Sequence, residues 1–398
     1  MLHPTHSDMR NDRIQTNTNG HDIPTMATRG LRSPALLELR KHGAAGYLFS
    51  SLMGIVLAGM LASCGVVQAT GGSFPATVPA KISGSTLSWI SEPSAGFTPW
   101  RTVLRQTRTG VDVNAYLLTD APYVHDLRQI ARRGIPVRII LAANPYHDPA
   151  AIADEKTLLA GSRIQWHWAP SRFDTAYATD HAKYLIVNPG TSQAVAIVGS
   201  PNGTWSAFGG DNAEDAMETS RPAITTALTQ VFQADWTGRS AGPALRHTLV
   251  LSPGAQSVFL TLLASSGPVA VTAEELGDAP ALYRALAAHG AMARLLVSSR
   301  LLTSPTAQRT VAFLRQAGVQ VRTLHRPYVH AKLLVTAQQT WVGSQNWSAP
   351  SLDNNREVGI TTANPTVHAH ALAWFNQLWT RAVPWPARLV PREGEEEW

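Results

Sequence analysis

The chain has a single cysteine, Cys64, among its 398 residues. One thiol excludes an intramolecular disulfide framework and a zinc site built from paired cysteines. No Gly-rich phosphate loop, Cys-x-x-Cys pair, His-Glu-x-x-His helix or dinucleotide fingerprint occurs in the sequence. We therefore expect a chemistry that uses neither a metal nor another cofactor.

Charged residues are also few, at 15% of the chain, against 44% hydrophobic residues. A chain of this length and composition can hold two domains of ordinary size. The formal net charge of +6 is mildly basic. It suits an anionic substrate or surface, but no dense stripe of Lys and Arg demands nucleic acid.

Lysine is scarce, because arginine carries most of the positive charge. The only lysines are Lys41, Lys81, Lys156, Lys183 and Lys332. Two of the five stand in the same short pattern, which is described next. A chain that otherwise prefers Arg thus keeps Lys at both of these places, which favours a specific need for a compact ammonium group there.

One short pattern occurs twice. Each copy reads His-x-Lys, then Gly-Ser-x-Asn, then Asn-x-Glu, beside an apolar run rich in β-formers. The shared positions are His181, Lys183, Ser200, Asn202 and Glu214 in the first copy and His330, Lys332, Ser344, Asn346 and Glu357 in the second. Two such strings, about one domain apart, predict one site built from the two halves of a duplicated fold.

The chemistry that uses such a set is phosphodiester transfer. Negative charge spreads over the non-bridging oxygens in the transition state, so fixed cations and amide donors must surround them. Two Lys and two Asn would supply that cradle. One His would attack phosphorus, and the other would protonate the leaving oxygen and then activate water. Glu214 and Glu357 are the candidates to hold the far ring nitrogens. Ser200 and Ser344 either donate to phosphate or to these Glu, or are only turn residues.

The doubled pattern resembles the phospholipase D superfamily, whose signature is His-x-Lys-x4-Asp followed by Gly-Ser-x-Asn. The resemblance covers roughly residues 85–385. It implies an α/β fold of two α/β/α sandwich halves related by a pseudo-twofold axis. It also implies an active site across their interface and a mechanism without metal or cofactor. His181 would be the nucleophile and His330 the general acid, or the reverse, because the site is pseudo-symmetric.

The chain departs from this signature twice. Asn188 stands at the Asp position of the first copy and Ala337 at that of the second. In the family this Asp is thought to support the motif rather than to contact phosphate. The loss therefore questions the local support of the motif, and it leaves open a catalytically silent protein that kept its phosphate pocket.

The copies resemble each other beyond the motifs, since residues 111–122 align with residues 269–280. In each copy we expect strand, helix, strand, loop, motif strand and second strand. The expected strands are 111–118, 137–142, 183–187, 194–198, 293–298, 319–324, 332–336 and 340–342, and the expected helices are 120–133, 223–236, 281–289, 306–317 and 366–383. Trp205 and Trp347 each follow a Gly-Ser-x-Asn turn, and we expect them at the rim of the site or, alternatively, in the core.

The N-terminal part is expected to lie outside the catalytic fold. Residues 47–62 are the apolar core of a secretory signal, and Leu61 to Gly65 resembles a bacterial lipobox with Cys64 as the lipidated residue. The alternative is an uncleaved transmembrane anchor, and Met26 is an alternative start. The expected divisions are a disordered extension 1–42, a signal segment 43–64, a linker 65–84, halves 85–242 and 243–388, and an acidic tail 389–398.

These observations give three functional hypotheses. The first is a membrane-tethered, extracytoplasmic phospholipase D-like lipoprotein that hydrolyses or transfers the headgroup of a phospholipid at a bilayer. The second is a metal-independent nuclease that cuts DNA or RNA. The third is the silent phosphate-binding protein. Aromatic residues near the site suit either a lipid interface or base stacking and do not separate the first two.

Overall fold

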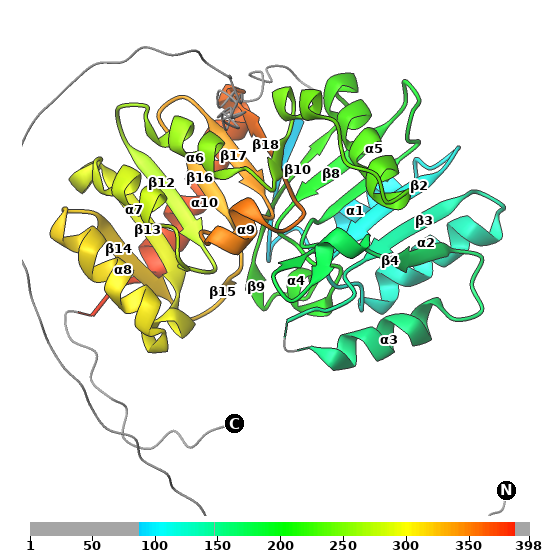
Figure 1. Ribbon diagram of the computed structural model, residues 1–398, viewed down its shortest axis with the longest axis horizontal. Helices are drawn as coiled ribbons and strands as arrows, with labels where there is room; N and C mark the ends of the chain where they lie inside the picture. The colour runs from blue at the N-terminus through cyan, green and yellow to red at the C-terminus, as the bar shows by residue number, and fades with distance from the viewer. Residues whose placement is uncertain (1–86, 147, 387–398) are drawn as a thin grey trace, which may run out of the picture. The chain divides into compact units, whose positions relative to one another are not determined.

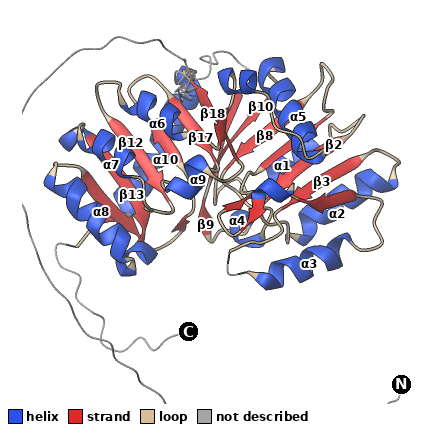
Figure 2. Cartoon of the chain, in the orientation of Figure 1, coloured by secondary structure: helices blue, strands red, loops and turns tan. Residues whose placement is uncertain are grey.

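The computed structural model describes residues 87–146 and 148–386, which form two mixed β-sheets with helices on their faces (Figures 1 and 2). Several expectations fall outside these residues, namely the extension 1–42, the signal segment 43–64 with Cys64, the linker 65–84 and the tail 389–398. Among the described residues, no helix combines the length and the apolar character needed to cross a membrane.

The first sheet has seven strands in the order β1-β10-β8-β7-β2-β3-β4. Strands β2, β3 and β4 run parallel to one another, and the remaining pairs are antiparallel. The bounds are Leu87–Ser91 for β1, Val111–Ala115 for β2, Val137–Leu141 for β3, Gln165–Trp168 for β4, Tyr184–Val187 for β7, Val195–Gly199 for β8 and Asp215–Thr219 for β10.

The second sheet repeats this order as β11-β18-β17-β16-β12-β13-β14, with β19 added at its edge. The same three inner strands, β12, β13 and β14, are parallel. The bounds are Val250–Ser252 for β11, Val269–Ala273 for β12, Ala293–Ser298 for β13, Gln320–Leu324 for β14, Leu333–Val335 for β16, Thr340–Gly343 for β17, Glu357–Thr362 for β18 and Val383–Pro384 for β19. The strand-for-strand match confirms the duplicated α/β fold.

The helices also repeat in the same order. In the first half they are α1 (Thr98–Leu104), α2 (Ala121–Arg132), α3 (Pro149–Leu159), α4 (Trp205–Phe208) and α5 (Pro222–Trp236). In the second half they are α6 (Gln256–Leu263), α7 (Pro280–Ala287), α8 (Pro305–Gln316), α9 (Ala349–Asp353) and α10 (Pro365–Arg381). Short 3-10 turns at Ser171–Phe173, Pro243–His247, Gly290–Met292 and Ser299–Thr303 and a hairpin of β5 (Asp174–Thr175) with β6 (Ala178–Thr179) complete the connections.

Each sheet is covered on both faces, which explains why the inner strands are apolar without alternation. In β3, Ile139 and Leu141 pack into the core that contains α1 and α2, whereas Ile140 packs into the core that contains α5. Successive side chains of a strand point to opposite faces, so a three-residue apolar run feeds two cores. The second half has an equivalent outer core under α6, α7 and α8.

The central core belongs to both halves. It contains Ile224 and Phe232 of α5, Trp374 and Phe375 of α10, and apolar residues of both sheets. At about 25 cal/mol per Å2 of buried apolar surface, a shared core of this kind joins the halves into one structural unit. A buried ion pair between Arg356 and Asp235, with Nε 2.8 Å from Oδ2, crosses the same contact.

Some local predictions were wrong. The motif strands β7 and β16 begin one residue after the expected starts at Lys183 and Lys332, so the His and Lys of each copy precede the strand. Strand β4, which contains His167, was not among the expected strands. Of the two positions expected for Trp347, the core is correct, because this residue is fully buried against Phe259 and does not reach the rim of the site.

The two departures from the family signature have different local replacements. Asn188 has a φ of 53°, in the left-handed region, and follows β7 directly. Its Oδ1 accepts from the backbone N–H of Arg108 (2.7 Å) and Thr109 (3.1 Å), and its Nδ2 donates to Gln106 O (3.1 Å). At the end of β16, the Thr336 hydroxyl instead accepts from the N–H groups of the following turn. Local support of the motif is thus retained without Asp.

Replacing Asn188 with Ala should lower the free energy of unfolding by roughly 2–4 kcal/mol. The change removes hydrogen bonds from buried backbone groups and places a residue with a Cβ but no side-chain acceptor in the left-handed region. Urea unfolding followed by circular dichroism measures this loss. Asn188→Asp keeps the Oδ1 acceptor and should lose less. Equal stability of the Ala variant and the wild type would contradict the supporting role.

Candidate active site

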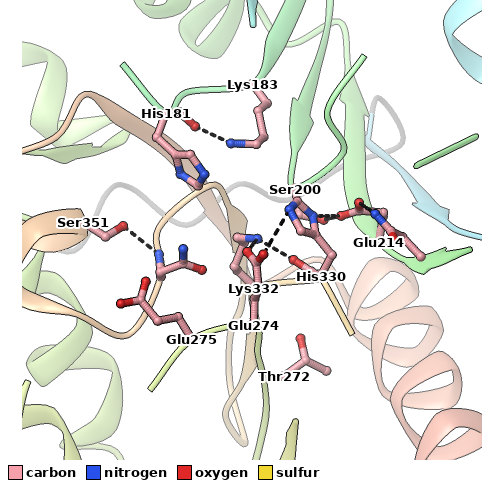
Figure 3. A network of polar contacts seen from close by, with 12 residues as sticks. His181, Lys183, Ser200, Glu214, Thr272, Glu274, Glu275, His330, Lys332 and Ser351 are labelled. Atoms are coloured by element: carbon pink, nitrogen blue, oxygen red, sulfur yellow. Dashed lines mark hydrogen bonds and ion pairs between the residues drawn. The ribbon is translucent and has the colours of Figure 1, made fainter. Parts of the chain in front are cut away.

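The two motif histidines lie at the contact between the halves, and each is held by a glutamate of the other half. Figure 3 shows one of these contacts, between His330 and Glu214. His181 Nδ1 lies 2.9 Å from Glu357 Oε2, and His330 Nδ1 lies 2.6 Å from Glu214 Oε2. A carboxylate only accepts, so each Nδ1 carries the proton in these bonds. Because Nδ1 of each ring faces the carboxylate, Nε2 points away from the Glu.

Backbone pairing between the halves brings these groups together. Strand β15 (Tyr328–Val329), just before His330, runs parallel to β9 (Asn212–Ala213), just before Glu214. The equivalent bridge joins Asp180 to Arg356, where His181 N donates to Arg356 O at 2.8 Å. Each His-x-Lys segment is thus fixed beside the Asn-x-Glu segment of the opposite half.

The lysines of the two copies share one contact and differ in another. Lys183 Nζ donates to His181 O at 2.7 Å, and Lys332 Nζ donates to His330 O at 2.5 Å. Lys183 also lies over the ring of Tyr116, 4.9 Å from its centroid. Lys332 instead forms a short ion pair with Glu274. The duplicated site is therefore symmetric in its histidines and asymmetric in its charges.

The remaining predicted site residues fall into two groups. Asn202 and Asn346 line the same cleft as the histidines, and the buried amide oxygen of each has no hydrogen-bond partner among the described residues. Ser200 Oγ donates to Glu214 at 2.6 Å, as one of the two predicted alternatives stated. Ser344 does not match this, since its hydroxyl bonds the backbone of Val358.

Three residues of the site were missed by the sequence analysis. Ser351 of α9 takes the place expected for Ser344 and donates to Glu357 Oε1 at 2.5 Å. Tyr116 packs edge-on against His181, with 4.6 Å between ring centroids. Glu274 contacts Lys332, and its Oε1 lies 3.4 Å from His330 Nε2. The alignment of residues 111–122 with 269–280 already pairs Tyr116 with Glu274. The sequence could therefore have indicated that the two halves differ at this position.

Burial and charge set the protonation of the site. Burial lowers the pKa of His181 although Glu357 opposes it, which favours the neutral ring. Burial would raise the pKa of Glu214 and of Glu357, but the histidine on each and the nearby lysine bring the pKa below its ordinary value. Burial lowers the pKa of Lys183 from 10.5 to about 7. An anion beside Lys183 would restore its charge.

The two histidines open onto a cleft of about 2480 Å3 that residues of both halves line. His325 lines this cleft, as do Tyr146 and Tyr177, whose exposed fractions are 80% and 82%. Within the described ranges, no three His, Cys, Asp or Glu side chains are grouped to hold a metal ion. Metal-independent chemistry stays a prediction.

Comparison with protein families identifies the fold and site together. A family described as cardiolipin synthase, PLD-like domain, matches residues 101–236 and 272–379, one segment in each half. The chain belongs to this family. It is thus a member of the phospholipase D superfamily with both copies of the domain. No curated protein sequence matches the chain.

Solved structures share this phospholipase D-like fold at low sequence identity. Phosphatidylserine synthase from Haemophilus influenzae aligns with a TM-score of 0.60 and 10% identity, over 76% of this chain and 89% of that one. Polyphosphate kinase from Porphyromonas gingivalis aligns with a TM-score of 0.55 and 14% identity. That alignment covers 74% of this chain but half, 50%, of the kinase. At these identities the likeness shows the fold alone.

The Lys183→Met variant should be more stable than the wild type below pH 7, by at most about 5 kcal/mol. The folded pKa of about 7 lies below the ordinary 10.5, so the unfolded chain binds more protons between these pH values. Wild-type stability from this lysine therefore rises with pH across that window, and the advantage of the variant shrinks. Urea unfolding at pH 6, 8 and 10 measures the difference, with exposed Lys156→Met as control. A difference independent of pH would contradict the assignment.

Glu357→Gln should lower the turnover of a chromogenic phosphodiester by roughly 100-fold while changing KM little. The amide keeps the shape of the side chain but removes the charge that orients and stabilises the His181 ring. Steady-state kinetics measure the effect. Glu218→Gln, on the strand that follows Glu214, is the matched control and should retain wild-type turnover. Wild-type turnover in the Glu357 variant would remove this carboxylate from the mechanism.

Proposed function

We propose that the protein is a phospholipase D-type phosphodiesterase that hydrolyses or transfers the headgroup of a phospholipid through a phosphohistidine. The observation that carries the proposal is the crossed pair of His–Glu contacts, His181 with Glu357 and His330 with Glu214, at one cleft that both histidines line. The lysine two residues after each histidine bonds the backbone of that histidine. A nucleophile and a proton donor on opposite sides of one phosphorus are what two-step transfer requires.

In the first step, His181 Nε2 attacks phosphorus, and the bond from phosphorus to the leaving oxygen breaks. His181 is suited to attack because burial lowers its pKa and Nε2 has no hydrogen-bond partner among the described residues. His330 gives its Nε2 proton to the leaving oxygen. In the second step, His330 takes a proton from water or an alcohol, whose oxygen displaces His181 from phosphorus. Water gives phosphatidic acid, and an alcohol gives a new phosphodiester.

Lysine and asparagine side chains support the charge that develops on phosphorus. Lys183 and Lys332 supply ammonium groups, and Asn202 and Asn346, which line the cleft, supply amide N–H donors. Such fixed donors need no reorganisation during the reaction. Glu214 and Glu357 act on the histidines rather than on the substrate.

A phospholipid substrate is supported by three features. The family of this chain carries the description cardiolipin synthase, PLD-like domain, and a protein with the same fold is a phosphatidylserine synthase. Exposed Tyr146 and Tyr177 at the cleft suit a bilayer interface, where amphipathic rings are stable. The sequence before Cys64 fits a lipoprotein signal, with a transmembrane anchor as the alternative. We accordingly propose an extracytoplasmic enzyme tethered to a membrane.

A nuclease is the second candidate, and one observation favours it. Arg300, Arg326 and Arg381 line the cleft on the side of the second half. A positive wall along a long cleft would follow a nucleic-acid backbone. Arg300 lies over the Tyr328 ring, 4.6 Å from its centroid, which leaves it less available for phosphate than a free guanidinium.

The full-length chain, purified in detergent and kept in chelator, should convert labelled phosphatidylcholine or phosphatidylglycerol to phosphatidic acid, or to a new phosphodiester when glycerol is added. His181→Ala should reduce the product at least about 1,000-fold, because it removes the nucleophile. His325→Ala, which changes another histidine of the same cleft, should retain activity. Thin-layer chromatography of the lipids measures the products.

Single-stranded DNA is incubated in parallel with the same three proteins. DNA fragments that depend on His181, without phosphatidic acid, would replace the lipid proposal by the nuclease. If neither substrate is cleaved, the silent phosphate-binding protein becomes the better explanation.

A further inference from the structure

One position breaks the symmetry of the duplicated site. Tyr116 follows β2 directly, and Glu274 follows β12 at the equivalent place. The Tyr116 ring lies against Lys183 and His181. Figure 3 shows the Glu274 carboxylate beside Lys332 and His330. An aromatic ring in one half is thus replaced by a negative charge in the other.

This replacement changes the charge that the site presents to an anion. Within the described part of the chain, the Lys183 ammonium bonds only the His181 carbonyl and has no carboxylate partner. Lys332, with no exposed side-chain surface, is already paired with Glu274. The carboxylates of Glu214 and Glu357 lie behind the histidine rings, on Nδ1. Lys183 is therefore the lysine whose positive charge a bound anion can neutralise.

We propose that Glu274 is a specificity-determining residue that makes the phosphate pocket accept a singly charged phosphodiester in preference to a doubly charged phosphate monoester. This inference deepens the proposed function and rests on it for the identity of the reaction. A bound monoanion restores the charge of Lys183 and pairs with it. A dianion brings a second negative charge close to the Glu274 carboxylate, and an unbalanced charge in a buried site is costly.

The chemistry of the proposed reaction gives this preference a use. The substrate is a diester with one negative charge. Phosphatidic acid, the product of hydrolysis, is a monoester that carries up to two. A pocket that disfavours the dianion releases the product and resists inhibition by free phosphate.

The test compares two small anions at pH 8 by 31P NMR titration of the full-length protein in detergent. Dimethyl phosphate is the singly charged probe, and inorganic phosphate is mainly doubly charged. Wild type should bind dimethyl phosphate at least as tightly as inorganic phosphate. In Glu274→Gln, the ratio of the two affinities should move at least about ten-fold toward inorganic phosphate, because the repelling carboxylate is gone.

Glu275→Gln is the matched control. Glu275 is the next residue, lines the same cleft and accepts from Ser348 Oγ at 3.3 Å rather than from Lys332. In this variant, the ratio of the affinities for the two anions should equal that of the wild type. Glu274→Tyr, which copies the first half, should shift the ratio in the same direction as Glu274→Gln and replaces that variant if it fails to fold, as judged by its melting curve.

Three results would overturn the inference. They are an unchanged ratio in a folded Glu274 variant, a wild type that already prefers inorganic phosphate, and a wild type and variants that bind neither anion. The titration needs no turnover, so it is separable from the lipid assay. The expected ratios without phospholipid cleavage would refute the proposed reaction alone, whereas phospholipid cleavage with an unchanged ratio would refute only the role of Glu274.

Discussion

Two buried carboxylates, each satisfied from the opposite half, determine how this site is built. Glu214 and Glu357 have no exposed surface, and an unpaired carboxylate in such a place would be strongly destabilising. Glu214 accepts from His330 and Ser200, and Glu357 accepts from His181 and Ser351. Both histidines come from the other half. Docking of the halves and assembly of the site are therefore one event, and the shared core beneath α5 and α10 stabilises both.

The duplication was predictable because both copies keep the same residue types at the motif positions, and because strands covered on two faces are apolar throughout. The pairing of each histidine with the glutamate of the other half was not predictable. Glu214 follows Asn202 closely, and nothing in the spacing says whether its carboxylate turns to His181 or to His330. The choice is made by backbone pairing of β9 with β15, a contact between segments far apart in the chain. Sequence spacing carries no information about such a contact until the docking of the halves is known.

The tryptophans show how a motif can mislead over a distance of two residues. Trp347 directly follows Asn346 and bridges to Leu276, the place that Gly203 occupies opposite Leu118 in the first half. It therefore points into the core. Trp205 stands three residues after Asn202, two positions further along its own copy than Trp347. It lies at the start of α4 and is 63% exposed. Both follow a Gly-Ser-x-Asn turn, but a shift of two positions in the repeat separates a core residue from a surface one.

A duplicated site must lose its symmetry if its two histidines are to do different things. In the proposed reaction one ring attacks as a neutral base while the other donates a proton, and identical surroundings would not distinguish them. The position after β2 and β12 supplies the distinction. Beside Tyr116, His181 meets no carboxylate of the described residues at Nε2, so that nitrogen is free to attack. Beside Glu274, His330 has a carboxylate oxygen near each ring nitrogen, at 2.6 Å and 3.4 Å. A carboxylate oxygen near each nitrogen suits a ring with a proton on both, which is the form that a general acid needs.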